Sequence, residues 1–245
     1  MPLSTSSSLL PLSTETGTWA AEIANAQPFA DVLGVDIDWE VHSPGTSQNG
    51  NIDFSTVDVT RPLPWGRDQF DLIHIKGLLL DMPSYSQLIE RLAMVLRPGG
   101  MLVIVESEPA YRSAAGSQLP ASLRTWDACV REAYASKGID VSTASRLVSS
   151  VAASGVFSSS PYCQQLGLPL GGYMRGDSYT LQKAGQLHSR LVASTLKTMV
   201  PSLVEHGYSK LDIDQLLQSV LAELGRPEAK YFQRLFAVYA TKNPS

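Results

Sequence analysis

The feature that most constrains the fold is a turn near the N-terminus followed, about 20 residues on, by a buried strand that ends in a carboxylate. Gly17 opens a helical segment, the apolar run 32–35 reads as a strand buried on both faces, and Asp36 closes it. This layout is typical of a nucleotide-binding half-sheet in an α/β protein. A glycine-rich turn should precede the helix, but residues 9–17 read LLPLSTETG, with a single glycine.

Length and composition narrow the class of protein. The chain has 245 residues, which suits one large α/β domain, and a formal net charge of −4 gives no electrostatic reason to bind nucleic acid. Cys129 and Cys163 form neither a Cys-x-x-Cys pair nor a disulfide framework, which favours a reducing compartment. Residues 1–8 lack the features of a signal peptide, and no run is long enough to span a membrane. We therefore predict a cytoplasmic protein with no nucleic-acid or membrane partner.

Strand-like and helical patterns alternate through the first 108 residues. Pro11 cannot donate to a strand ladder and weakens an interior position for the first strand, whereas Thr18 is the expected cap of the first helix. Pro98-Gly99-Gly100 should end the second helix. This alternation predicts a parallel sheet with helices on both faces. The expected strands are 9–12, 30–35, 52–57, 70–75 and 101–105, and the expected helices are 19–26 and 84–96.

The second half of the chain is mainly helical. Asp177 is a plausible N-cap for a long helix with a kink at Pro201, and Ser209 and Asp212 form a capping-box pattern before another. Pro161 interrupts a strand-like stretch. We predict one domain, 1–245, made of a nucleotide-binding-type core (9–108), cap helices with a connecting strand (109–228) and a last strand (229–245). The expected helices are 119–137, 144–154, 177–205 and 211–224, and the expected strands are 156–168 and 232–240.

Five short motifs in order give the chain a family resemblance. They are GTWA at 17–20, GVD at 34–36, DVT at 58–60, FDLIH at 70–74 and VLRPGG at 95–100. Together they resemble the class I S-adenosylmethionine-dependent methyltransferases, in particular the fungal branch of small-molecule secondary metabolism. The resemblance implies a Rossmann-like α/β fold: a mostly parallel seven-stranded sheet with an antiparallel last strand and a C-terminal helical cap. Relatives usually carry helices before the first strand, which implies a more open site here or a truncated gene model.

The resemblance also places the cofactor. In the family, an Asp/Gly/Gly/Gly turn wraps the methionine part of S-adenosylmethionine; the matching residues here are Pro11, Ser13, Glu15 and Gly17. Pro11 replaces the acid that helps to hold the amino-acid tail, and Glu15 puts an anion near the ligand carboxylate. Each change costs on the order of 1–3 kcal/mol, so together they weaken binding by about a hundredfold or more. The expected methyl-donor site is therefore degenerate at its methionine end.

The rest of the cofactor site is kept. By the same resemblance, Asp36 accepts hydrogen bonds from the ribose hydroxyls, although it could also simply cap a turn, and Asp58 lies on the adenine side. We predict no metal, because the histidines show no ligand spacing. The expected cofactor-binding residues are Gly17, Thr18, Trp19, Asp36 and Asp58.

Several residues are candidates for catalysis. His74 lies in an apolar strand, where a packed core histidine is the commoner outcome. Lys76, Asp81 and Glu106 follow the strand ends that bind ligands in such sheets, although charges there are often simply solvated. Candidates to line an apolar pocket under the C-terminal helices, although such residues are more often part of a core, are Trp19, Trp65, Trp126, Tyr162, Tyr173 and His188. The catalytic candidates are His74, Lys76, Glu106, Tyr173 and His188.

Three functions remain open on the sequence. The first is an enzyme that binds a small, fairly apolar metabolite and catalyses a non-methylating cyclisation or isomerisation through proximity. The second is an active methyltransferase that tolerates the altered turn. The third is a non-catalytic regulator that keeps the fold as a scaffold. Whether the chain is an enzyme, and whether it forms a homodimer, stays open.

Overall fold

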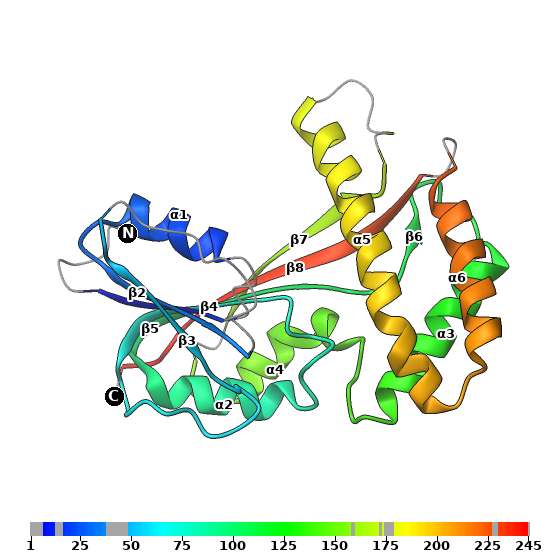
Figure 1. Ribbon diagram of the computed structural model, residues 1–245. Helices are drawn as coiled ribbons and strands as arrows, with labels where there is room; N and C mark the ends of the chain where they lie inside the picture. The colour runs from blue at the N-terminus through cyan, green and yellow to red at the C-terminus, as the bar shows by residue number, and fades with distance from the viewer. Residues whose placement is uncertain are drawn as a thin grey trace. The chain divides into compact units, whose positions relative to one another are not determined.

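The computed structural model describes residues 7–12, 17–37, 49–157, 160–171, 173, 179–226 and 230–244. The chain forms two compact units, which are treated separately (Figure 1). The first comprises Met1–Glu106, Ser145–Gln164 and Phe236–Ser245. The second comprises Ser107–Ala144 and Gln165–Leu235.

The first unit is built on an open sheet with strand order β3-β2-β1-β4-β5-β8. The pairs β3–β2, β2–β1, β1–β4 and β4–β5 are parallel. Lys242 N–H donates to the Gly100 carbonyl and Glu108 N–H to the Arg234 carbonyl, both at 2.9 Å, so β8 runs antiparallel to β5. The strands are β1 (Ser8–Leu12), β2 (Asp31–Asp36), β3 (Ile52–Thr56), β4 (Phe70–Lys76), β5 (Leu96–Ser107) and β8 (Tyr231–Thr241).

Helices cover both faces of this sheet. In Figure 1, α1 (Thr18–Ala26) lies on the side opposite α2 (Tyr85–Val95) and α4 (Leu147–Ala153). The face under α1 is a small apolar cluster of alanine, valine and leucine side chains. The short alanine side chains let the backbone of α1 pack closely against the strands. The buried members are Leu9, Ala20, Ala24, Ala30 and Val32.

The predicted strands and helices of this unit are confirmed, with local differences. Pro11 is buried inside a central strand, where its recorded partner is His74 of β4. The cap of α1 is Gly17, with no side-chain hydrogen bond, so the prediction that Thr18 caps the helix is wrong. The helix α2 ends at Val95, and β5 begins at the next residue rather than after Pro98-Gly99-Gly100.

The second unit is mainly helical. Its long helices α3 (Ala121–Ala135), α5 (Tyr179–His206) and α6 (Lys210–Leu224) pack against one another. Ser209 caps α6 by accepting from Asp212 N–H at 3.4 Å, as the sequence predicts, and Pro201 lies inside α5. The predicted cap Asp177 lies outside the described residues.

Strands join the helices of the second unit. The two-residue β6 (Arg112–Ser113) pairs antiparallel with β8 and raises the strand count of the sheet to eight, one more than predicted. The strand β7 (Tyr162–Pro169) also pairs with β8. The backbones of α5 and of the turn after β7 touch: a Cβ on Gly185 would lie 2.2 Å from the Gly171 carbonyl oxygen. Glycine at 185 is therefore required by packing. Within the described ranges, no helix is both long and apolar enough to cross a membrane.

Candidate functional site

The carboxyl ends of the parallel strands define one edge of the first unit. Because β1, β2, β4 and β5 run in the same direction, the residues that end them lie along this edge. Asp36 is the last residue of β2, Lys76 the last of β4, and Glu106 the next-to-last of β5. In open α/β sheets, ligands bind in the crevice outside this edge. We call it the carboxyl edge.

At the end of β1, the carboxyl edge is apolar and aromatic. Gly17 takes a left-handed conformation, with φ of 68°, and its carbonyl accepts the first helical bond from Ala21 N–H at 2.9 Å. The Trp19 indole, in the first turn of α1, stacks on the His74 imidazole with 3.9 Å between ring centroids and 11° between planes. Pro11, beside His74, supplies no charged group. Ser13 and Glu15 lie outside the described residues.

His74 is a buried, neutral imidazole at physiological pH. Its side chain is almost fully covered, and burial, followed by the nearby positive charge of Lys76, lowers its pKa to about 4. A base with so low a pKa is poorly suited to take a proton from a substrate near neutral pH. Lys76 itself is exposed. The geometry therefore favours a packing role for His74, which the sequence had left as an alternative to catalysis.

At the ends of β2 and β4, the same edge carries carboxylates. Asp36 is partly exposed, and Asp81 lies in the loop between β4 and α2. Partial desolvation raises the pKa of Asp81, and the negative charge of Asp36 raises it further, so the two carboxylates lie close enough to interact. Such a pair of acceptors suits a ligand that presents hydroxyl groups or a positive charge.

Glu106 lies near the end of β5, on the same edge. Its side chain is 1% exposed, and its Oε1 accepts hydrogen bonds from the Leu78 amide, at 2.7 Å, and from the Tyr85 hydroxyl. Burial raises the pKa of Glu106 to about 7; the hydrogen bonds from Tyr85 and from the Leu78 and Leu79 amides oppose this shift, and the charge of Asp81 adds to it. The carboxyl group thus titrates near neutral pH while it bonds to the β4–α2 loop.

Asp58, the predicted adenine-side residue, is used by its own turn. Its Oδ1 accepts from the Thr60 amide at 2.9 Å and from the Thr60 hydroxyl at 2.6 Å, and its Oδ2 pairs with Arg61 at 3.0 Å. The Thr60 bonds, with a smaller part from Arg61, lower the pKa of Asp58. This geometry supports a turn-forming role; whether Asp58 also contacts a cofactor stays a prediction.

Tyr173 and His188, two of the predicted catalytic residues, belong to the second unit. His188 Nδ1 lies 3.1 Å from the Pro169 carbonyl oxygen, and Nε2 lies 3.1 Å from Gln233 Oε1. A neutral ring satisfies both contacts if the Gln233 amide turns its NH₂ toward Nε2. Burial raises the pKa of Tyr173. His188 thus ties α5 to the end of β7, a structural arrangement.

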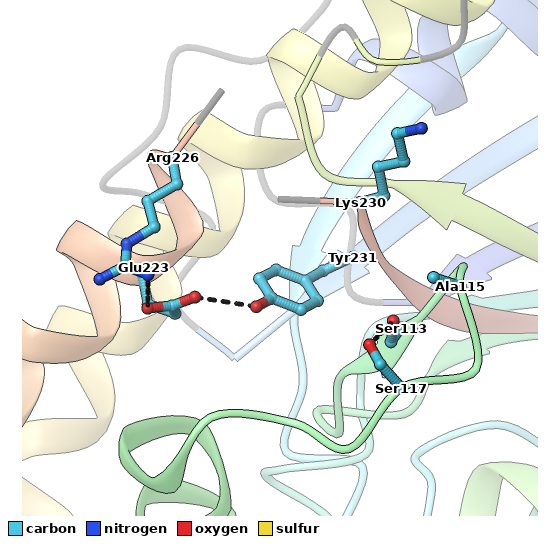
Figure 2. A pocket seen from close by; sticks show the side chains of 7 residues that line it. All are labelled: Ser113, Ala115, Ser117, Glu223, Arg226, Lys230 and Tyr231. Atoms are coloured by element: carbon cyan, nitrogen blue, oxygen red, sulfur yellow. Dashed lines mark hydrogen bonds and ion pairs between the residues drawn. The ribbon is translucent and has the colours of Figure 1, made fainter. Parts of the chain in front are cut away.

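Two cavities are found among the described residues, one in each unit. One, of about 160 Å³, is in the second unit (Figure 2). There, Glu223 accepts from the Tyr231 hydroxyl at 2.9 Å and pairs with Arg226 at 3.2 Å, while the Ser113 and Ser117 hydroxyls bond each other. The other, of about 240 Å³, is at the amino ends of β1, β2 and β4. Neither is lined by a predicted site residue.

The residues of the carboxyl edge fit only part of S-adenosylmethionine. Asp36 can accept from ribose hydroxyls, and the Gly17 turn opens a helix toward the edge. The end of β1 offers Pro11 and the Trp19–His74 stack in place of a carboxylate for the amino-acid tail. Among the described residues, Asp36 is thus the acceptor available to the nucleoside half of the cofactor, and none at the end of β1 supplies a carboxylate for its amino-acid tail.

Sequence reasoning did not assign Tyr85 or the amides of Leu78 and Leu79. Tyr85 reads as an ordinary apolar position of α2, and its hydroxyl shows no pattern in the sequence. The sequence did contain one indication of this cluster: Asp81 and Glu106 are carboxylates that follow neighbouring predicted strands of the sheet. Glu108, two residues further on, forms instead a bidentate pair with Arg234, at 2.6 and 2.9 Å, inside the second unit.

The sheet order and the ligand edge are those of a class I methyltransferase fold. Residues 10–100 match the family model described as methyltransferase domain. Among relatives, the secondary metabolism regulator laeA of Coprinopsis cinerea is 26% identical over 246 residues, 96% of this chain and 59% of that protein. The protein-methionine methyltransferase laeA of Emericella nidulans is 32% identical over 134 residues, 55% of this chain and 35% of that protein. The solved structure of the [4+2]-cyclase SpnF has a TM-score of 0.51 at 17% identity, over 98% of this chain and 76% of that one.

Residues 10–100 thus resemble a methyltransferase domain of the class I fold, and the relatives that the chain resembles include fungal proteins of secondary metabolism. The chain spans between about a third and three fifths of the length of these two curated relatives. The cyclase likeness is one of fold alone.

Proposed function

We propose that this protein is an enzyme of small-molecule secondary metabolism that keeps the nucleoside half of the S-adenosylmethionine site and has lost the methionine half. The observation that supports the proposal is the contrast along one edge of the sheet. Asp36 and Asp81 present carboxylates at the ends of β2 and β4, whereas the end of β1 presents Pro11 beside a closed Trp19–His74 stack.

Such a site suits a reaction other than methyl transfer. Without a hold on the amino-acid tail, the sulfonium methyl of a bound cofactor is not aimed at an acceptor, and in-line transfer depends on that alignment. A cyclisation or isomerisation of a small apolar metabolite needs only a shaped site and a few polar groups. Ile37, which follows Asp36 and is 65% exposed, provides apolar surface at this edge.

The test is a calorimetric titration with S-adenosylmethionine, S-adenosylhomocysteine and 5′-methylthioadenosine, which lacks the amino-acid tail. If only the nucleoside half is recognised, the three affinities agree within about threefold, because the tail makes no net favourable contact. A complete site binds the two tailed ligands about a hundredfold more tightly than methylthioadenosine, and this outcome would favour an active methyltransferase.

Two variants of β2 localise the binding. Asp36→Asn removes the carboxylate at the ligand edge and should weaken all three ligands about tenfold, since a hydrogen bond to a charged acceptor contributes about 1.5–3 kcal/mol. Asp31→Asn changes an exposed carboxylate at the opposite end of the same strand and should leave the affinities unchanged. If both variants bind like the wild type, the nucleoside lies elsewhere.

A non-catalytic regulator is the second candidate. It is favoured by the Coprinopsis relative, described as a regulator, whose alignment covers 96% of this chain. A protein that binds none of the three ligands at millimolar concentration, and whose melting temperature no metabolite raises, would support this role, because an occupied site stabilises the folded state.

A further inference from the structure

The loop between β4 and α2, residues 77–84, forms one wall of the carboxyl edge. Gly77 follows β4 in a left-handed conformation, with φ of 73°, and its N–H donates to the Val105 carbonyl at 3.1 Å. A turn follows, closed by Asp81 N–H donating to the Leu78 carbonyl at 3.0 Å. Asp81 is exposed, and the charge of Asp36 contributes to raising its pKa, so the two carboxylates are near enough to interact.

The backbone of this loop is held from below. The Leu78 amide donates to Glu106 Oε1 at 2.7 Å, and the Leu79 amide also bonds this carboxylate. The Tyr85 hydroxyl, from the first turn of α2, donates to the same oxygen. One buried carboxyl group thus joins the end of β5, the loop and the start of α2. Charge-assisted bonds of this kind are about twice as strong as neutral ones.

We propose that Glu106 is a positioning residue: by binding the Leu78 and Leu79 amides and the Tyr85 hydroxyl, it holds the β4–α2 loop so that Asp81 faces Asp36 across the nucleoside end of the site. This inference rests on the proposed function only for the identity of the ligand. With its side chain 1% exposed and its Oε1 bonded to two donors, Glu106 supports the ligand edge from within the protein.

Among the described residues, Glu106 is influenced by two titratable groups. Tyr85 faces it from α2 and Asp81 from the loop, and Asp36 of β2 acts on Asp81. The ionised carboxylate accepts from all its donors, whereas the protonated form carries a hydrogen on one oxygen and accepts fewer bonds. The hydrogen bonds from the loop and from Tyr85 favour the ionised form of Glu106, whose pKa is about 7, so lowering the pH through 7 should loosen the loop while the carboxyl group stays buried.

The experiment compares Glu106→Gln and Tyr85→Phe with the wild type and with Glu90→Gln, an exposed carboxylate on the same helix α2. Hydrogen exchange of residues 77–84 reads the order of the loop without any ligand. We expect exchange, corrected for its intrinsic rate, to rise about tenfold in Glu106→Gln, because neutral bonds replace charge-assisted ones, and less in Tyr85→Phe. Glu90→Gln should exchange like the wild type.

Binding of 5′-methylthioadenosine is measured on the same proteins between pH 6 and 8. The wild-type affinity should fall about fivefold toward pH 6, and Glu106→Gln should bind weakly at every pH, with no inflection near 7. If Glu106 only stabilised the fold, Glu106→Gln would lower the melting temperature but would keep the inflection in nucleoside binding near pH 7.

The outcomes separate the two proposals. Faster loop exchange in Glu106→Gln, with no nucleoside binding by any protein, supports the positioning role and overturns the proposed ligand. Nucleoside binding by the wild type, with loop exchange and pH profile unchanged in Glu106→Gln, overturns the positioning role alone. If Glu106→Gln fails to fold, Tyr85→Phe decides by the same measurements, because it removes one hydroxyl and keeps the carboxylate.

Discussion

The end of β1 and the ends of β2 and β5 lie on one edge of the same sheet, yet they have opposite chemistry. At β1, Pro11 and the Trp19–His74 stack fill the edge with apolar and aromatic groups. At the ends of β2 and β5 and in the loop after β4, Asp36, Glu106 and Asp81 place carboxyl groups along the edge, and Glu106 accepts a hydrogen bond from the Leu78 amide. Parallel strands of one sheet thus keep their order and register while the chemistry at their carboxyl ends differs from strand to strand.

The largest effect should come from restoring the β1 side. The triple substitution Pro11→Asp, Ser13→Gly and Glu15→Gly recreates the acid and the glycines that the family uses around the methionine tail. We expect S-adenosylmethionine to bind about a hundredfold more tightly, or about 2.7 kcal/mol, when measured by calorimetry.

The control for the triple substitution is 5′-methylthioadenosine, whose affinity should not change because it has no tail. A folded triple variant that binds both ligands like the wild type would mean that the apolar β1 end is not what limits cofactor binding. The comparison between the two ends of the edge would then lose its functional meaning.

The next effect concerns the pH dependence of stability on the carboxylate side. Because the pKa of folded Glu106 is raised from 4.5 to about 7, the folded protein binds this proton more tightly than the unfolded chain. Its contribution is therefore most favourable at low pH and is lost as the pH rises through about 7. Between pH 5 and 8, the free energy of unfolding of the wild type should fall by about 2 kcal/mol relative to that of Glu106→Gln.

Chemical denaturation at several pH values measures this slope, and the exposed Glu90→Gln should keep the wild-type slope. Equal slopes in the wild type and in Glu106→Gln would show that Glu106 titrates alike in the folded and unfolded chain. In that case the pKa of Glu106 in the folded protein would be that of an exposed carboxyl group.

The same contrast explains what the sequence can predict. Strands such as β2 and β4 follow from short apolar runs that end in Asp36 and Lys76, because burial on both faces needs such runs. The first strand forms although Pro11 breaks a local rule, because strands on both sides hold it in place. At this position, pairing with the two neighbouring strands outweighs the low strand propensity of proline. The cap of α1 was misassigned to Thr18 since a left-handed glycine needs no side chain to end a turn.

The site was harder to predict than the fold. The positions of Asp36 and Glu106 follow from strand ends, but the hydroxyl of Tyr85 and the amides of Leu78 and Leu79 converge only when the loop folds back on β5. Such contacts between residues 20 to 30 positions apart leave no periodic pattern in a single sequence. The choice between packing and catalysis for His74 likewise depends on its stacking partner, Trp19.

A smaller effect should follow from opening the aromatic side. Trp19→Leu keeps an apolar side chain but removes the ring stacked on His74, which should lower the free energy of unfolding by about 1 kcal/mol. The pKa of His74, held at about 4 mainly by burial, should rise as water reaches the ring. Nuclear magnetic resonance titration of the imidazole measures this change. An unaltered pKa would show that the strands alone keep His74 buried.

The smallest effect should distinguish the two aspartates that the family resemblance assigns to the cofactor. In Asp58→Asn the side-chain oxygen still accepts from the Thr60 amide, so the turn should persist and the melting temperature should stay that of the wild type. If Asp58 serves only its turn, 5′-methylthioadenosine should bind this variant as tightly as the wild type, in contrast to Asp36→Asn. A clear loss of affinity would instead extend the ligand-binding part of the edge from β2 to the end of β3, and the retained half of the site would be larger than Asp36 and Asp81 define.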